Sequence, residues 1–217
     1  MPPDAFTLAF DTSAAHCAAA LLCGTDLVAL RQEDMAKGQA ERLMPMIEEM
    51  LAGEGLTWGD LALIGVGTGP GNFTGVRLSV SAARGLALSL GVPAIGVTSL
   101  EAAAYELPRP VLAALDARRG EFYLQMFGED APGPVLAGPD ALPAWAFEAP
   151  LVVGDAAEAL GDLLPEARCA EPAMPAVEAI ARIAASRAAR PQPRPAPLYL
   201  RAADAAPPRD PAPELIP

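Results

Sequence analysis

The sequence is nearly devoid of two residue types that carry much of protein chemistry. It contains one histidine, His16, and one lysine, Lys37, among 217 residues. A single imidazole cannot supply the paired histidine ligands of a typical catalytic zinc site, and the HExxH pattern is absent. The GxSxG nucleophile elbow and the P-loop lysine are absent as well. These gaps argue against a metallopeptidase, a serine hydrolase and a P-loop NTPase, and we expect His16 to be a strand residue with a local hydrogen bond.

Cysteine and long apolar runs are also scarce. The three cysteines, Cys17, Cys23 and Cys169, form no CxxC motif, so we expect free thiols in a reducing compartment. No window approaches the roughly 18 consecutive apolar residues of a membrane-spanning helix. The first residues lack the basic region of a signal peptide. These features predict a cytoplasmic protein without a membrane span.

Positive charge is limited too. The chain has 15 Lys and Arg residues and 27 Asp and Glu residues, which gives a formal net charge of −12. Affinity for nucleic acid depends on neutralised phosphates, so the whole chain has the wrong charge to hold nucleic acid by itself. This charge does not exclude a subunit whose partner holds the nucleic acid.

The order of apolar patterns indicates alternating strands and helices. A helical face is formed by Leu43, Ile47, Met50 and Leu51, and Pro45 predicts a kink or a late start of that helix. The order of elements predicts an α/β fold with a mixed sheet. The expected elements are strands 7–11, 16–22 and 26–31, helix 39–51, strand 61–67, helix 74–90, strand 94–98 and helix 100–106.

One pattern occurs twice. Residues 7–22 and 110–127 each read as a strand, an aspartate, a turn and a second strand, with Asp11 and Asp116 at the strand ends. This repetition indicates a duplicated lobe. We therefore predict an N-terminal lobe over residues 1–107, a smaller second lobe over 108–204 and a proline-rich tail over 205–217. The second lobe is expected to contain strand 151–154 and helices 155–164 and 176–189.

A glycine-rich segment invites a nucleotide hypothesis. Residues 65–75 follow a strand and open a helix, where backbone N–H groups attract phosphate. The alternative is a tight turn that lets the helix pack closely on the sheet, because the spacing never fits GxGxxG. The two aspartates could hold a metal–nucleotide between the lobes, which would suit an autonomous ATP-binding phosphotransferase. The candidate nucleotide or phosphate contacts are Asp11, Thr12, Ser13, Gly69, Gly71, Asn72, Asp116 and Arg118.

The helix 74–90 carries apolar or small residues over much of its circumference, which predicts burial on more than one side. Methionines of helix 39–51 would suit an adaptable protein contact. The alternative is that both helices simply pack on each other and on the sheet. The candidate partner-interface residues are Leu43, Met44, Ile47, Met50, Leu51, Gly75, Val76, Ser79, Ala82, Ala83 and Leu86.

Several motifs resemble one known family. Residues 69–77 read GPGNFTGVR, a specific string, and 116–121 read DARRGE. Together with AFDTS at 9–13, AERLMPMI at 40–47, TSLE at 98–101 and PLYLR at 197–201, they resemble the TsaB (YeaZ) family of bacterial tRNA threonylcarbamoyladenosine biosynthesis proteins. The motifs follow the family order over about residues 6–127, whereas residues 128–195 carry little recognisable signal.

The resemblance implies an actin/Hsp70/sugar-kinase-like (ASKHA) fold with two RNase-H-like lobes, the second of them trimmed. It implies a non-catalytic dimerisation subunit that binds the catalytic paralogue TsaD through helices of the N-terminal lobe. TsaD transfers the threonylcarbamoyl group to the tRNA adenosine beside the anticodon, and the ATPase TsaE joins the complex. The chain would need no cofactor or metal of its own, with ATP or ADP at a subunit boundary. It could form a homodimer when alone and would meet tRNA only through the complex.

Two departures from family patterns matter. The family often has a histidine near the start of the first helix, where this chain has Gln39 and Ala40. The paralogue's metal-binding histidine pair is absent here, which makes a metallopeptidase the remotest alternative.

Overall fold

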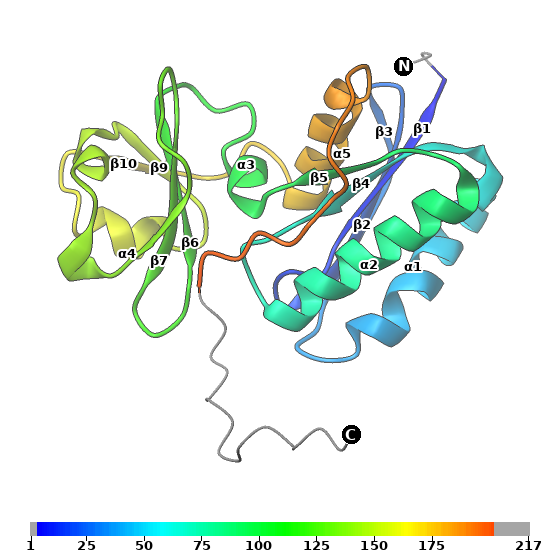
Figure 1. Ribbon diagram of the computed structural model, residues 1–217, viewed down its shortest axis with the longest axis horizontal. Helices are drawn as coiled ribbons and strands as arrows, with labels where there is room; N and C mark the ends of the chain where they lie inside the picture. Colours follow the sequence, from blue (N-terminus) through cyan, green and yellow to red (C-terminus); the bar gives the residue numbers. More distant parts are fainter. Residues whose placement is uncertain (1–3, 202–217) are drawn as a thin grey trace, which may run out of the picture.

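The computed structural model describes residues 4–201, which form two α/β lobes, each built on a five-stranded sheet (Figure 1). The predicted tail over residues 205–217 lies outside the described residues.

The first sheet is mixed, as predicted. Its order is β3-β2-β1-β4-β5, with β1 paired antiparallel to β2, β2 antiparallel to β3, and β4 parallel to both β1 and β5. The meander makes the antiparallel half, and a helical crossover makes the parallel half. The strands are β1 (Phe6–Asp11), β2 (His16–Cys23), β3 (Asp26–Asp34), β4 (Leu61–Gly67) and β5 (Ala94–Val97).

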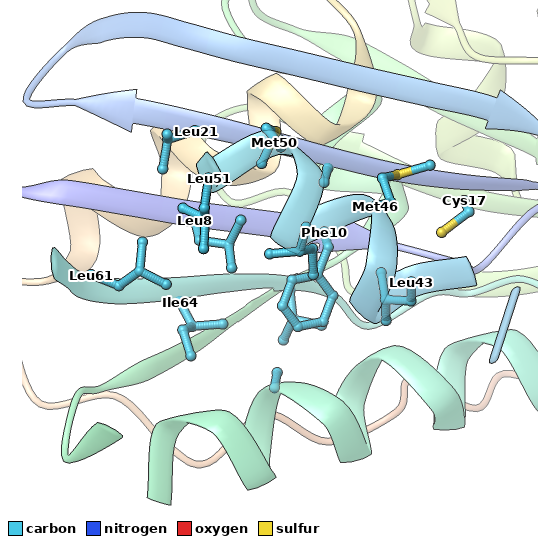
Figure 2. Packing of buried hydrophobic residues seen from close by; sticks show 14 of the residues in the cluster. Leu8, Phe10, Cys17, Leu21, Leu43, Met46, Met50, Leu51, Leu61 and Ile64 are labelled. Atoms are coloured by element: carbon cyan, nitrogen blue, oxygen red, sulfur yellow. The ribbon is translucent and has the colours of Figure 1, made fainter. Parts of the chain in front are cut away.

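Helices cover both faces of this sheet (Figure 1). The helices α1 (Gln39–Gly53) and α2 (Phe73–Leu90) pack on one face, and α3 (Ser99–Ala103) and α5 (Ala176–Arg187) lie on the other. Successive strand side chains alternate between the faces. Leu8 and Phe10 point toward α1 and α2, as Figure 2 shows, whereas Ala9 between them packs against α5.

The second sheet repeats the first in reduced form. Read from the other edge, its order β8-β7-β6-β9-β10 matches β3-β2-β1-β4-β5, and the pairing directions match as well. This shared topology supports the interpretation of a duplicated lobe. The elements are β6 (Val111–Asp116), β7 (Phe122–Phe127), β8 (Val135–Ala137), β9 (Leu151–Val153), α4 (Ala157–Gly161) and β10 (Arg168–Ala170).

The helix predicted over 176–189 does not belong to the second lobe, which corrects that part of the prediction. It forms α5, which packs on β1, β2 and β4 of the first sheet. The apolar side of α5 meets small residues there: Ala184 lies so close to Gly65 that a Cβ on Gly65 would fall 3.0 Å from the Ala184 Cβ. The chain therefore returns to the first lobe after β10.

Residues 188–201, here called the C-terminal strap, link the two lobes. In Figure 1 the strap runs in orange and red from α5 toward the second sheet. The Leu198 N–H donates to the Thr68 carbonyl of the first lobe at 2.8 Å. Arg201 donates to the Ala117 carbonyl at 2.8 Å and pairs with Glu121 at 2.7 Å in the second lobe.

Candidate functional site

The end of β1 carries a buried carboxylate held by its own turn. Asp11 Oδ2 accepts hydrogen bonds from the Ser13 N–H at 3.2 Å and the Ser13 hydroxyl at 2.8 Å, and it lies 2.9 Å from His16 Nε2. Oδ1 is buried without a hydrogen-bond partner among the described residues. A Cβ on Gly67 would fall 1.9 Å from that oxygen, so only glycine leaves room for the carboxylate.

His16 is a strand residue with a local hydrogen bond, as predicted. The hydrogen bond to Asp11 raises the pKa of His16 above its ordinary value, against the opposing effect of burial. The charges of Asp11 and Asp34 add to the rise. The Asp11 and His16 side chains thus form an internal ion pair when the imidazole is protonated.

The glycine-rich segment fits tightly against the first turn. A Cβ on Gly71 would fall 2.3 Å from the Ser13 carbonyl oxygen, and one on Gly75 would fall 1.9 Å from that of Thr12. The Asn72 N–H donates to the Ser13 carbonyl at 2.6 Å, and the Thr12 hydroxyl donates to the Gly75 carbonyl at 2.7 Å. These contacts favour the interpretation of a tight strand-to-helix turn.

The first N–H groups of α2 already have an acceptor within the chain. The Asn72 side chain is the N-cap, and its oxygen accepts from the N–H groups of Thr74 and Gly75, both at 3.0 Å. A phosphate bound at a helix N-terminus accepts hydrogen bonds from these same first backbone N–H groups. A phosphate that used the N–H groups of Thr74 and Gly75 would therefore have to displace the Asn72 cap.

The predicted nucleotide residues fall into two groups. The first group lies where the turn after β1 contacts the glycine-rich segment, and it consists of Asp11, Thr12, Ser13, Gly69, Gly71 and Asn72. The Ser99 hydroxyl lies 3.3 Å from the Ser13 hydroxyl at the same place. Asp116 and Arg118 belong to the second lobe. There the Arg118 N–H donates to Asp116 at 2.7 Å, and the Asp116 N–H donates to Asp155 at 2.9 Å. The nucleotide role of these residues stays a prediction.

Residues 4–201 offer neither a cluster of metal-binding side chains nor a membrane-spanning helix. No group of three or more His, Cys, Asp or Glu side chains in this range is placed to hold a metal ion. No helix in the same part of the chain has the length and apolar character needed to cross a bilayer.

Most of the predicted partner-interface side chains lie in the core of this chain, which favours the alternative that both helices pack on each other and on the sheet. The small-residue side of α2 faces its own sheet, where the Ser79 hydroxyl donates to the Gly67 carbonyl at 3.2 Å. A buried side chain cannot contact a partner unless the core opens. The buried members are Leu43, Ile47, Met50, Leu51, Gly75, Val76, Ser79 and Ala83. Met44, Ala82 and Leu86 are partly exposed at the edge of the same core.

One surface cluster was missed from the sequence. The Arg77 guanidinium stacks 3.7 Å above the Phe73 ring, and its Nε donates to the Tyr199 hydroxyl at 2.6 Å. Both rings are about half exposed. All three residues lie within the motifs that resemble the family, but 122 positions separate Arg77 from Tyr199, so only the fold reveals that they meet.

Comparisons with known proteins agree on one family. The family model for TsaD, tRNA N6-adenosine threonylcarbamoyltransferase, matches residues 32–139. An uncharacterised protein of Mycobacterium tuberculosis, Rv3421c, is 36% identical over 205 residues, covering 92% of this chain and 93% of the relative. The tRNA threonylcarbamoyladenosine biosynthesis protein TsaB of Escherichia coli is 37% identical over 131 residues, covering 58% of this chain and 56% of TsaB. The chain thus matches about half the length of that curated TsaB.

Solved structures give the same family and a wider fold class. YeaZ from Pseudomonas aeruginosa has a TM-score of 0.70 at 26% identity, covering 90% of this chain and 100% of that one. A more distant likeness is to component A of (R)-2-hydroxyglutaryl-CoA dehydratase from Acidaminococcus fermentans, with a TM-score of 0.52 at 10% identity. The match covers 86% of this chain and 100% of that one, and it shows the fold alone. These likenesses confirm the predicted ASKHA fold with two sheets. Motifs, topology and relatives together show that this chain belongs to the TsaB/YeaZ family.

Proposed function

We propose that the chain is a non-catalytic scaffold subunit of the complex that makes threonylcarbamoyladenosine in tRNA, where it binds and supports the catalytic subunit TsaD. Family membership is the observation that carries this proposal, because relatives named for that biosynthesis align with this chain. TsaE is a further partner, the complex rather than this chain alone binds tRNA, and the complex works in the cytoplasm. The chain requires no cofactor, and ATP or ADP would bind at a subunit boundary.

The outer surface of α1 and α2 is the part of the first lobe that best fits a protein partner. The two helices lie on the same face of the sheet (Figure 1). Four partly exposed apolar side chains, here called the outer seam, pack on the edge of the core: Met44 from α1 and Leu78, Ala82 and Leu86 from α2. Covering such side chains with a partner's helices removes apolar surface from water.

The test introduces charge into the outer seam. Ala82→Arg and Leu86→Arg should each weaken TsaD binding by about 30-fold or more, which is the scale of an interface hot spot. The fold should survive because both positions are partly exposed. Ile47 and Ala83 are unsuitable, since both are 0% exposed and an arginine there would disrupt the core.

Calorimetric titration of the chain with TsaD from the same organism measures the effect. Leu163→Arg is the matched control, because Leu163 is 37% exposed and lies in the second lobe. The control should bind like the wild-type chain. Wild-type affinity in both seam variants would show that the seam is not the interface, and absence of binding by the wild-type chain would contradict the proposed function itself.

A further inference from the structure

Two stretches of this acidic chain contain no acidic residue. Residues 61–100 and 179–201 hold seven arginines and neither Asp nor Glu, whereas the remaining residues hold eight basic and all 27 acidic side chains. The first stretch forms β4, α2 and β5, and the second forms most of α5 and the C-terminal strap.

Folding brings the strap from the second stretch beside β5 and α2 from the first. Pro195 of the strap lies 3.5 Å from where a Cβ on Gly96 of β5 would stand, and Tyr199 bonds to Arg77 of α2. Figure 1 shows the strap running past β5 toward the beginning of α2. The arginines of α2 and the strap therefore share one side of the molecule, in stretches that contain no acidic residue.

Four of these arginines are exposed and lack an acidic partner among residues 4–201: Arg77, Arg84, Arg190 and Arg194. Arg84 and Arg194 line the same cavity of about 460 Å³ between α2, β5 and the strap. Its wall includes Leu88, which is 85% exposed. Two guanidinium groups without counter-charges thus converge on one open groove.

The aromatic cluster continues this surface toward the start of α2. The Phe73 and Tyr199 rings lie 5.3 Å apart between centroids, and each is about half exposed. Arg77 uses its Nε for Tyr199, while Nη1 and Nη2 have no hydrogen-bond partner within residues 4–201. These two nitrogens can donate to an oxyanion, and the exposed ring faces can stack on a planar group.

We propose that the surface formed by Phe73, Arg77, Arg84, Arg190, Arg194 and Tyr199, here called the basic belt, contacts the RNA backbone. Successive unpaired guanidinium groups along a helix and a strap suit the repeated phosphates of a polyanion, and stacking rings suit unpaired bases. The acidic remainder of the molecule repels RNA and so limits contact to the belt. The identity of the RNA as tRNA rests on the proposed function, whereas the contact itself rests on the belt.

The test measures binding of fluorescein-labelled tRNA by anisotropy to the complex of the full chain with TsaD, at several salt concentrations. Arg84→Glu combined with Arg194→Glu should lower the affinity by about tenfold or more at roughly 0.1 M salt, and should reduce the salt slope by about two phosphate contacts. Single Arg84→Glu is compared with Arg168→Glu as the matched control. Arg168 is exposed on β10, in the second sheet.

A second pair of variants tests the rings. Tyr199→Leu should weaken tRNA binding about tenfold, because stacking of one base on an aromatic side chain is worth about 1–3 kcal/mol, and Tyr199→Phe should keep most of the affinity. Equal tRNA affinity in the Arg84→Glu and Arg168→Glu complexes, with an unchanged salt slope in the double variant, would overturn the proposal. Failure of the Arg84→Glu and Arg194→Glu double variant to form the complex with TsaD would also overturn it, since the belt would then be a protein contact.

Light scattering checks complex formation before each titration, which separates the two proposals. If the wild-type chain forms no complex with TsaD, the proposed function fails. In that case the restriction of tRNA binding to the complex no longer holds, and the same titrations on the chain alone test the belt: Arg84→Glu should lower tRNA affinity more than Arg168→Glu. Equal tRNA affinity of the belt variant and the control variant in these titrations would overturn the proposed RNA contact.

Discussion

Single residues at the first turn show how a ligand-like motif can be explained by packing. Asp11, Gly71 and Gly75 fit a nucleotide hypothesis by sequence. In the fold, the Asp11 carboxylate accepts hydrogen bonds from its own turn, and the two glycines leave room for the carbonyl oxygens of Ser13 and Thr12. The glycines predict a tight turn from the sequence alone. The sequence does not predict which atoms lie against each glycine, because those atoms belong to the separate hairpin of β1 and β2.

The Asp11–His16 pair predicts a pH dependence of stability. The pKa of His16 is raised from 6.5 in the folded chain because the imidazolium bonds to Asp11. A raised folded-state pKa stabilises the fold fully below the unfolded pKa, and this stabilisation is lost as the pH rises through the folded pKa. Urea unfolding from pH 5.5 to 8.5 should show this loss in the wild-type chain and a smaller one in His16→Gln. Parallel pH profiles for the two proteins would contradict the assignment.

Two glycines of α2 form a matched pair. Gly75→Ala should destabilise the chain by roughly 2–4 kcal/mol, because the new Cβ would fall 1.9 Å from the Thr12 carbonyl oxygen. A Cβ on Gly85 would meet nothing within 4 Å. Gly85→Ala should therefore stabilise the chain by about 0.5–1 kcal/mol through helix propensity. Denaturant unfolding measures both, and equal effects of the two substitutions would contradict the packing of the first turn on α2.

At the scale of elements, local periodicity predicted much of the first lobe. Strands and helices from β1 to α2 were expected within a few residues, because their apolar spacing is set within each element. The three-residue strands β8 and β10 were missed, because three residues are too few to show a period. The equally short β9 was predicted as an apolar run. The position of α5 was also missed: its apolar side predicts burial, but the partner sheet is decided by tertiary packing. The spacing of small residues on α2 likewise left two alternatives open, a partner and the chain's own sheet, and the fold shows that Gly75, Ser79 and Ala83 face the sheet.

The first helix contains a proline that it accommodates without ending. α1 runs from Gln39 to Gly53 through Pro45, which is exposed. Proline has no N–H, so the helical hydrogen bond to the carbonyl four residues earlier is missing. Pro45→Ala should stabilise the chain by about 1–2 kcal/mol, after allowance for the greater freedom of the unfolded chain. Thermal or urea unfolding measures this change, and a loss of stability would indicate that Pro45 serves the packing of α1.

At the scale of the whole molecule, composition hides the distribution of charge. The net charge of −12 predicts that the whole chain is a poor ligand for nucleic acid. The arginines of α2 and the strap come together only because the strap returns beside α2 and β5, which no local pattern predicts. The ASKHA fold could be predicted from the motifs, since they identify the family. The face that meets a partner could not be predicted, because spacing does not distinguish a core side from an outer side.

The central claim is that this chain supports threonylcarbamoyl transfer to tRNA by binding TsaD. The most direct measurement is the content of threonylcarbamoyladenosine in tRNA, determined by mass spectrometry of nucleosides from cells depleted of this chain. The content should fall on depletion, recover with the wild-type chain or Leu163→Arg, and stay low with the combined Ala82→Arg and Leu86→Arg variant. An unchanged content after depletion would contradict the claim.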